Sequence, residues 1–297
     1  MKRILLVFCM LSMGSLAWAQ SAPSLGTAAN FAVLGGTAVT CTSSVITGDV
    51  GVSPGSAVTN TGCTISGTVH ANDSAAMTAS TDFLSAYNAI GLMPCTQTIL
   101  TTAFTGNVPA LGPLAPGVYC FPAAVAFTNT TLTLDGSTNP NGIWVFKVGA
   151  ALTGTGFQVV LSNGAQPCNV FWAVGAAATL TTSTPPPLFQ GNLLAGNTTG
   201  GSITITGGSL VGRALASVAV TMTTTNVNGV CALVDQAVAQ AKAGCKDDDD
   251  DRDKDKDKDK DKDKDKDHHR HHDKDKDKDK DKDKDKDKDK DGDKDHN

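Results

Sequence analysis

Six short segments of this chain alternate apolar residues with threonine. They are residues 39–42, 131–134, 152–155, 179–181, 203–206 and 220–223. A period of two is typical of a β-strand with one buried and one exposed face. Turn-forming pairs such as Gly35-Gly36 and Gly207-Gly208 separate the segments. Many short strands of similar chemistry indicate a sandwich, a barrel or a β-helix, and the pattern alone does not decide among them.

Two other kinds of segment complete the expected fold. Residues 143–146 and 170–174 are rich in aromatic and β-branched side chains, so we expect them to be buried strands. Residues 73–90 break the period of two, because their apolar side chains follow the spacing of one helical face: Ala76, Ala79, Phe83, Tyr87 and Ile90. Asp73 is the expected N-cap and Gly91 the expected stop. The sequence therefore predicts one amphipathic helix packed along the β-structure.

The N-terminal residues 1–19 have the composition of a secretory signal peptide. A basic start (Lys2-Arg3) precedes an apolar stretch, which ends in Ala17-Trp18-Ala19. This order predicts cleavage before Gln20 and export from the cell. Residues 20–245 are then the expected folded domain. Whether the exported protein is free or retained at the cell envelope stays open.

Residues 246–297 are almost entirely Asp, Lys and His. With no apolar side chains to bury, this tail is expected to be disordered. It contains a histidine island, formed by His268, His269, His271 and His272, that could bind metal weakly. The alternative is a solvated chain of mixed charge without a ligand.

Residues 20–245 contain few charged side chains: Lys147, Arg213 and Lys242 against Asp49, Asp73, Asp82, Asp135 and Asp235. An ordinary soluble domain has about 25% charged residues. Three basic groups cannot neutralise many phosphates, so we expect no nucleic-acid binding. Scattered carboxylates and a lone His70 are poor material for acid–base catalysis, and the carboxylates fit turn and capping roles. We expect no enzyme activity, no cofactor and, since no apolar run after residue 19 reaches about 20 residues, no membrane insertion.

Seven cysteines follow the signal segment, and none forms a C-x-x-C pair that would indicate zinc or a thioredoxin-type site. Export favours disulfides. Sequence does not fix their connectivity; the pairing we expect is Cys41–Cys63, Cys95–Cys120 and Cys168–Cys231, with Cys245 left over.

The threonine segments are the surface feature with a functional meaning. Stacked strands lie about 4.8 Å apart, and alternate residues along a strand lie about 6.6 Å apart. Threonine is stiff at χ1, so such rows form a regular, uncharged and pre-organised array. That array suits an ordered repetitive ligand such as ice or a crystalline polysaccharide. The alternative is that threonine is simply a favourable residue for an exposed strand.

Short motifs distributed over residues 25–227 resemble the ice-binding-like family, also called the DUF3494 domain. They occur in the family order at residues 30–34, 45–55, 116–119, 132–135, 144–146, 168–172, 190–192 and 212–216. The resemblance implies an all-β fold: a right-handed, discontinuous β-helix of triangular section, with one long α-helix alongside and the N-terminal coil against the C-terminal one. Pro185-Pro186-Pro187 and the charged tail depart from the family pattern.

The resemblance also implies that one flat face binds ice. By matching positions, this face would carry Thr40, Thr42, Thr131, Thr133, Thr153, Thr155, Thr179, Thr181, Thr204, Thr206, Thr221 and Thr223. We therefore expect a secreted, monomeric ice-binding (antifreeze) protein. A second hypothesis is an adhesion protein, in which the β-helix is a scaffold and the tail contacts metal or a surface polymer. A third, an exported polysaccharide-acting enzyme, would require acidic side chains to converge in a groove.

Overall fold

The computed structural model describes residues 21–106, 111–182 and 188–229. Several predicted features lie outside these ranges: the signal peptide (1–19), the proline run (185–187), Cys231, Cys245 and the charged tail (246–297).

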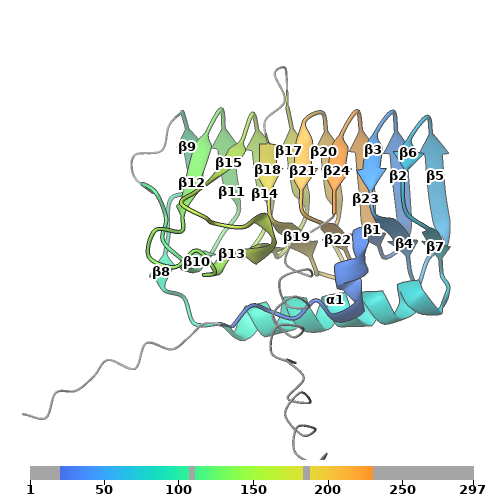
Figure 1. Cartoon of the computed structure of the whole chain (residues 1–297), viewed down its shortest axis with the longest axis horizontal. Helices are drawn as coiled ribbons and strands as arrows, with labels where there is room; N and C mark the ends of the chain where they lie inside the picture. Colours follow the sequence, from blue (N-terminus) through green and yellow to red (C-terminus); the bar gives the residue numbers. More distant parts are fainter. Residues whose placement is uncertain (1–20, 107–110, 183–187, 230–297) are drawn as a thin grey trace, which may run out of the picture. The chain divides into compact units, whose positions relative to one another are not determined.

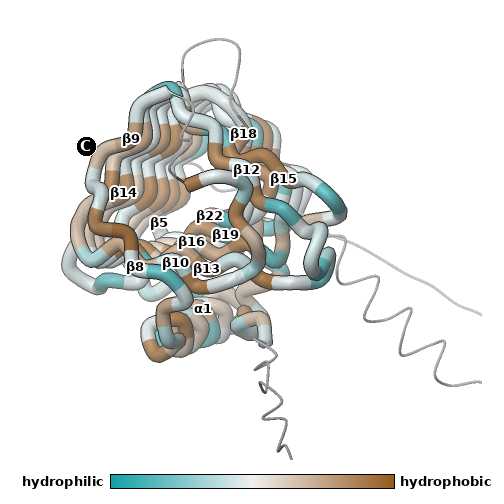
Figure 2. Tube along the Cα trace, turned by 90° about the vertical axis from the view of Figure 1, so that its left-hand side faces the viewer, coloured by the Kyte–Doolittle hydropathy of each residue, from teal (hydrophilic) through white to brown (hydrophobic). Residues whose placement is uncertain are grey.

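The strands form a β-helix with three faces around one core, and all coils but those at the two ends of the stack contribute a strand to each face (Figure 1). Every pairing is parallel and lies between equivalent strands of successive coils, as Figure 2 shows by looking along the stack. The β-helix with one long helix alongside is therefore confirmed.

The first face is a nine-stranded sheet. Its spatial order is β7 (Val69–Ala71), β4 (Asp49–Val52), β1 (Phe31–Gly35), β22 (Ala214–Ala216), β19 (Asn192–Ala195), β16 (Val170–Val174), β13 (Trp144–Val148), β10 (Gly117–Phe121) and β8 (Gln97–Thr98).

The second face is an eight-stranded sheet. Its order is β5 (Ala57–Thr61), β2 (Ala38–Thr42), β23 (Ala219–Thr223), β20 (Ile203–Thr206), β17 (Ala178–Thr181), β14 (Leu152–Thr155), β11 (Val125–Thr128) and β9 (Ala103–Thr105).

The third face consists of two sheets side by side, because β15 contacts β18. One sheet pairs β12 (Thr131–Asp135) with β15 (Gln158–Ser162), and the other has the order β18 (Leu188–Gln190), β21 (Ser209–Val211), β24 (Asn226–Asn228), β3 (Val45–Thr47) and β6 (Thr64–Ile65).

The coils do not stack in the order of the chain. The first coils, from β1 to β7, form one end of the stack, and the coil that begins at β8 forms the other end. Later coils then stack back toward the first, so the last one pairs with it: β22 with β1, β23 with β2 and β24 with β3. The family resemblance implied this meeting of the N-terminal and C-terminal coils, and the structure contains it.

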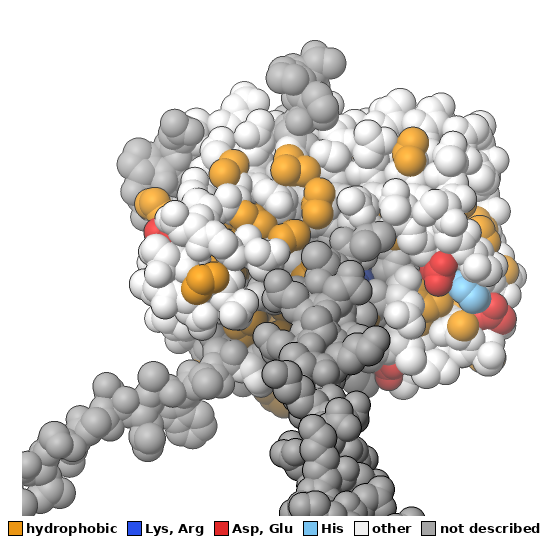
Figure 3. All heavy atoms as spheres, viewed as in Figure 1, with side chains coloured by type: hydrophobic (Ala, Val, Ile, Leu, Met, Phe, Trp, Pro, Cys, Tyr) orange, Lys and Arg blue, Asp and Glu red, His pale blue; other side chains and the backbone are white. Residues whose placement is uncertain are grey.

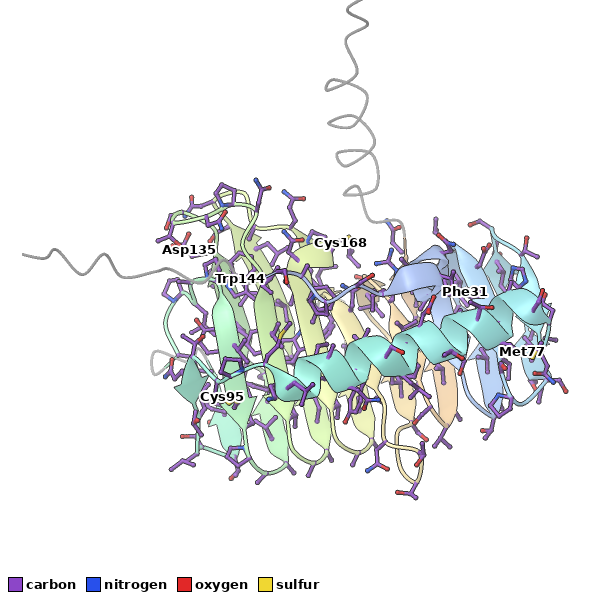
Figure 4. The ribbon with its side chains drawn as sticks, turned by 90° about the horizontal axis from the view of Figure 1, so that it is seen from below. Phe31, Met77, Cys95, Asp135, Trp144 and Cys168 are labelled. Atoms are coloured by element: carbon purple, nitrogen blue, oxygen red, sulfur yellow. A yellow bond between two sulfur atoms is a disulfide. The ribbon has the colours of Figure 1, made fainter. Side chains whose placement is uncertain are left out.

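The helix α1 (Ser74–Leu92) carries the chain from β7, at one end of the stack, back to β8 at the other (Figures 1 and 4). Asp73 caps its N-terminus by accepting a hydrogen bond from the Ala76 N–H at 2.9 Å. The helix runs past Gly91 and ends at Leu92, so the prediction that Gly91 stops it is wrong. It ends there because Met93 precedes a proline, and a residue in that position is disfavoured in the helical region.

The buried face of α1 covers the outside of the nine-stranded sheet. Its inward residues are Ala76, Ala79, Phe83, Ala86 and Ile90, and Tyr87 is only half-buried. Together with the 3-10 helix η1 (Gly26–Asn30) they form an apolar layer with outward side chains of that sheet, such as Val145 and Leu194. This layer explains why β16 is apolar on both faces, and why β13 is too except at Lys147.

The main core lies inside the coils and is arranged in rows. Phe146 stacks on Trp172 with ring centroids 4.0 Å apart, and Phe127 stacks on Phe157 at 4.2 Å. The aromatic segments 143–146 and 170–174 are buried, as predicted. Rows of this kind are consistent with the register of the β13–β16 and β11–β14 pairings, which has no shift.

Two of the expected disulfides, Cys41–Cys63 and Cys95–Cys120, are present. They join neighbouring coils at the two ends of the stack, where β5 and β8 each have a neighbour on one side only. Cys168, in the 3-10 helix η2 (Pro167–Asn169), is also disulfide-bonded, and its expected partner Cys231 lies outside the described residues.

Candidate functional site

The outward side of the eight-stranded sheet carries two parallel files of threonine. The turn-side file takes the last residue of every strand and is complete: Thr61, Thr42, Thr223, Thr206, Thr181, Thr155, Thr128 and Thr105. The central file lies two residues earlier and contains Thr59, Thr40, Thr221, Thr204, Thr179 and Thr153, followed by Ala126 and Ala103.

All sixteen side chains are half-buried or exposed, and alternate residues of the inner strands, such as Cys41 and Met222, are buried in the core. No Asp, Lys, Arg or His occurs on any of the eight strands. The surface is therefore uncharged over its whole length.

The register gives this surface a lattice-like repeat. Strands about 4.8 Å apart and alternate residues about 6.6 Å apart define a rectangular cell, with one methyl and one hydroxyl group at each corner that carries threonine. Seven strand gaps make each file about 34 Å long. The pairing between neighbouring strands is unshifted, since each Thr is in direct register with the next.

A sharp turn ends each threonine strand. The residue after the turn-side file has a left-handed backbone in seven of the eight coils that contribute to the sheet, for example Gly207 (φ 72°), Thr224 (φ 51°) and Asn129 (φ 49°). Its N–H donates to the carbonyl of the turn-side Thr in the next coil, as from Gly207 to Thr223 at 2.8 Å. These turns make all strands stop at the same line, so the surface has a straight edge.

The turn at Asn129 corrects one prediction. Ten of the twelve threonines predicted to share a face do lie on the eight-stranded sheet, but Thr131 and Thr133 do not. They lie on β12, which pairs with β15 on the third face. The chain bends between Thr128 and Thr131, because Asn129 is left-handed and Thr130 is buried, donating to the carbonyls of Phe104 and Thr128.

The files also contain four threonines that sequence analysis missed: Thr59, Thr61, Thr105 and Thr128. In β9 and β11 the residue two positions before the turn-side threonine is alanine, not threonine, so these strands show no repeated threonine. In β5 the inward residue between the two threonines is the polar Asn60, which hides the apolar alternation. Each strand does end in Thr followed by a turn residue, and this was the available signal.

Charged side chains gather away from this sheet. At the β7 end of the stack, His70 Nδ1 lies 2.7 Å from Asp73 Oδ2 and its Nε2 lies 3.9 Å from Asp49 Oδ2. Figure 3, which views the third face, shows the histidine between acidic side chains. Hydrogen bonds to the Asp73 carboxylate lower its pKa; the bond from the Ala76 N–H has the largest effect and the one from His70 the next largest. This cluster therefore holds the start of α1, which fits the structural roles predicted for His70 and Asp73.

The other described charges also have structural partners. Thr27 donates to Asp82 from its hydroxyl and its N–H, both at 2.7 Å, which lowers the pKa of Asp82. Lys147 donates to the carbonyls of Gly91 and Met93 at the end of α1. Burial lowers the pKa of Arg213 to about 10, and its guanidinium donates to Asn192 Oδ1 and the Ala29 carbonyl.

Within the described ranges, no group of three or more His, Cys, Asp or Glu side chains has a metal-binding arrangement. No helix in the same ranges is long and apolar enough to cross a membrane.

Comparison with known proteins gives consistent matches. The family model described as Ice-binding-like matches residues 33–228. An ice-binding protein of Nostoc sp. (strain HG1) is 41% identical over 235 residues, which cover 77% of this chain and 82% of that protein. An ice-binding protein of Flavobacterium frigoris (strain PS1) is 32% identical over 67% of this chain and 73% of its own length. The crystal structure of an ice-binding protein from Antarctomyces psychrotrophicus superposes with a TM-score of 0.63 and 30% identity, covering 71% of this chain and 99% of that one.

Proposed function

Because this chain belongs to the ice-binding-like family, we propose that it is an ice-binding protein and that the eight-stranded sheet is its binding surface. The single observation that carries this assignment is the pair of threonine files, in register over eight strands and free of charge. The names of the relatives, ice-binding proteins from bacteria and a fungus, support the same activity.

The mechanism we propose is adsorption. Each threonine offers a methyl group and a hydroxyl group in a fixed rotamer, so the array loses little side-chain entropy when it binds. Hydroxyl groups hydrogen-bond to water, and the methyl groups between them favour an ordered arrangement of that water. Water held at the lattice spacing of the files joins the crystal, and the bound protein blocks further growth at that point.

A charged group on this surface would oppose the mechanism, because a charge orders water around itself and loses hydration when ice covers it. The placement of Asp49, Asp73, Asp135 and Lys147 on other faces or at their edges agrees with this requirement. The activity needs no catalytic side chain and no cofactor, so we propose a non-enzymatic protein.

We further propose that the protein acts outside the cell as a monomer. The signal-type segment 1–19 supports export, and the disulfides Cys41–Cys63 and Cys95–Cys120 suit an oxidising compartment. A single chain supplies the complete surface, so binding requires no partner.

The adhesion hypothesis rests on the charged tail alone, and the matches to ice-binding proteins do not favour it. Deletion of residues 246–297 separates the two. Ice binding by the β-helix surface should persist without the tail, whereas adhesion through the tail should be lost.

The test of the proposal is inhibition of ice recrystallisation by the purified protein at micromolar concentration. Inhibition that disappears in Thr204→Tyr, with the melting temperature kept, would support both the activity and the surface. A folded parent protein without inhibition would overturn the proposal and leave adhesion as the leading account.

A further inference from the structure

A third file of small side chains runs beside the two threonine files. It lies two residues before the central file, and its first members pair directly: Ala57 with Ala38, and Ala38 with Ala219. Ser202, Ala177 and Ala151 continue it immediately before β20, β17 and β14. Their carbonyls accept the N–H groups of Ala178, Leu152 and Val125, so the hydrogen-bonded ladder extends to these positions.

Strand preference does not explain this small-residue file. Alanine is depleted in β-strands relative to threonine and valine, yet it occupies five of these six outward positions. Core packing does not explain it either, because all six side chains are half-buried or exposed.

Close packing at the preceding corner acts on glycines two residues before the file. A Cβ atom on Gly36 would lie 1.9 Å from the Ser217 carbonyl oxygen, and one on Gly55 would lie 2.0 Å from that of Thr37. Glycine is therefore required two residues before Ala38 and Ala57. Ala57 itself is exposed, so a larger side chain has space there.

We infer that the small-residue file is part of the ice-contact surface and sets how closely ice approaches the threonines. This inference rests on the proposed function. It widens the surface from two files to three, which is about 13 Å across four residues of extended strand. An alanine methyl group lies no higher than the threonine methyl groups, so a flat crystal face can contact all three files together.

The physical reason for keeping the file small is the short range of the contact. A gap of about 0.5–1 Å already loses a quarter to a half of the dispersion energy between two surfaces. A tyrosine in this file would hold the crystal several ångströms away from the neighbouring threonines, even though no threonine is changed.

The test compares two variants in this file, Ala219→Tyr and Ala177→Tyr, with one control. Val160→Tyr places the same side chain at a 40%-exposed position of β15 on the third face. Ice-recrystallisation inhibition and melting temperature are measured for each. We expect both file variants to lose most of the inhibition while Val160→Tyr keeps the parent's level.

Full inhibition by a folded Ala219→Tyr, under conditions where Thr204→Tyr has lost it, would overturn the inference and leave a two-file surface. Loss of inhibition in Val160→Tyr as well would also overturn it, because bulk alone would then be sufficient. Full inhibition by Thr204→Tyr would instead refute the proposed surface itself. If Ala219→Tyr does not fold, Ala57→Tyr decides by the same criteria, because that position is already exposed.

Discussion

Replacing Thr204 by aspartate should abolish ice binding without unfolding the protein. Thr204 lies in the central file on β20, with Thr179 and Thr221 in register on either side. Its side chain is half-buried and faces solvent. The substitution should therefore lower the free energy of unfolding by at most about 1 kcal/mol, which is the range of β-strand preferences.

The cost to binding is much larger. A carboxylate covered by ice loses the mobile water on that side, and effective desolvation penalties for an ion are several kcal/mol. Each 1.4 kcal/mol is a factor of ten in an equilibrium constant, so the adsorption constant should fall by about 100-fold or more. Thr204→Asn places a side chain of nearly the same shape as aspartate but without charge, so its adsorption constant should fall much less.

The assay is the lowest concentration that inhibits recrystallisation, measured beside thermal unfolding. Thr131→Asp is the matched control: it places the same charge on an alternating strand, β12, that the sequence pattern assigned to the same face. We expect Thr131→Asp to keep the parent's inhibition. Retention by Thr204→Asp together with loss in Thr131→Asp would refute the assignment of the surface to the eight-stranded sheet.

Three further changes test the surface, its support and the helix cap. Ala103→Thr combined with Ala126→Thr would complete the central file, so we expect inhibition at a lower concentration than the parent requires. Replacing Cys41 and Cys63 together by alanine removes a disulfide between residues 22 positions apart in sequence. The free energy of unfolding should fall by about 3 kcal/mol, and calorimetry should show a melting temperature lower by about 10 °C. Asp73→Ala should lower the melting temperature through loss of the N-cap hydrogen bond to the Ala76 N–H. The pKa of Asp73 is lower in the folded protein than its ordinary value of 3.8, so the ionised carboxylate stabilises the fold above that pH. This stabilisation is lost as the pH falls through the pKa of the folded state. The difference in melting temperature between the parent and Asp73→Ala should therefore narrow below about pH 4.

The sequence predicted the strands better than it predicted their assignment to faces. Period-two alternation located six strands, β2, β12, β14, β17, β20 and β23, and helical spacing located α1. The assignment to one face failed at residues 131–134, which alternate like the other five segments but lie on the third face. The left-handed backbone of Asn129 turns the chain from the second face to the third. An asparagine in a threonine-rich segment does not by itself predict that conformation.

The coil order could not be read from the pattern of residues. The pairing of Thr40 with Thr221 joins positions far apart in sequence, and local alternation is the same whichever coil is the neighbour. The family resemblance supplied this order. The completeness of the turn-side file also became visible only from the register, because Thr105 and Thr128 lie in strands without a repeated threonine and Asn60 interrupts the apolar alternation beside Thr61.

The return path of α1 links the size of the surface to the length of one helix. Its 19 residues span about 28 Å, and the stacked strands that it passes are about 4.8 Å apart. One additional coil therefore needs about three more helical residues. Three residues turn the helix by about 300°, which would displace Phe83 or Ile90 from the sheet unless the connections before β8 adjusted. A chain of this topology cannot enlarge its surface by duplicating one coil alone, and we expect the number of coils to vary only together with compensating changes in α1.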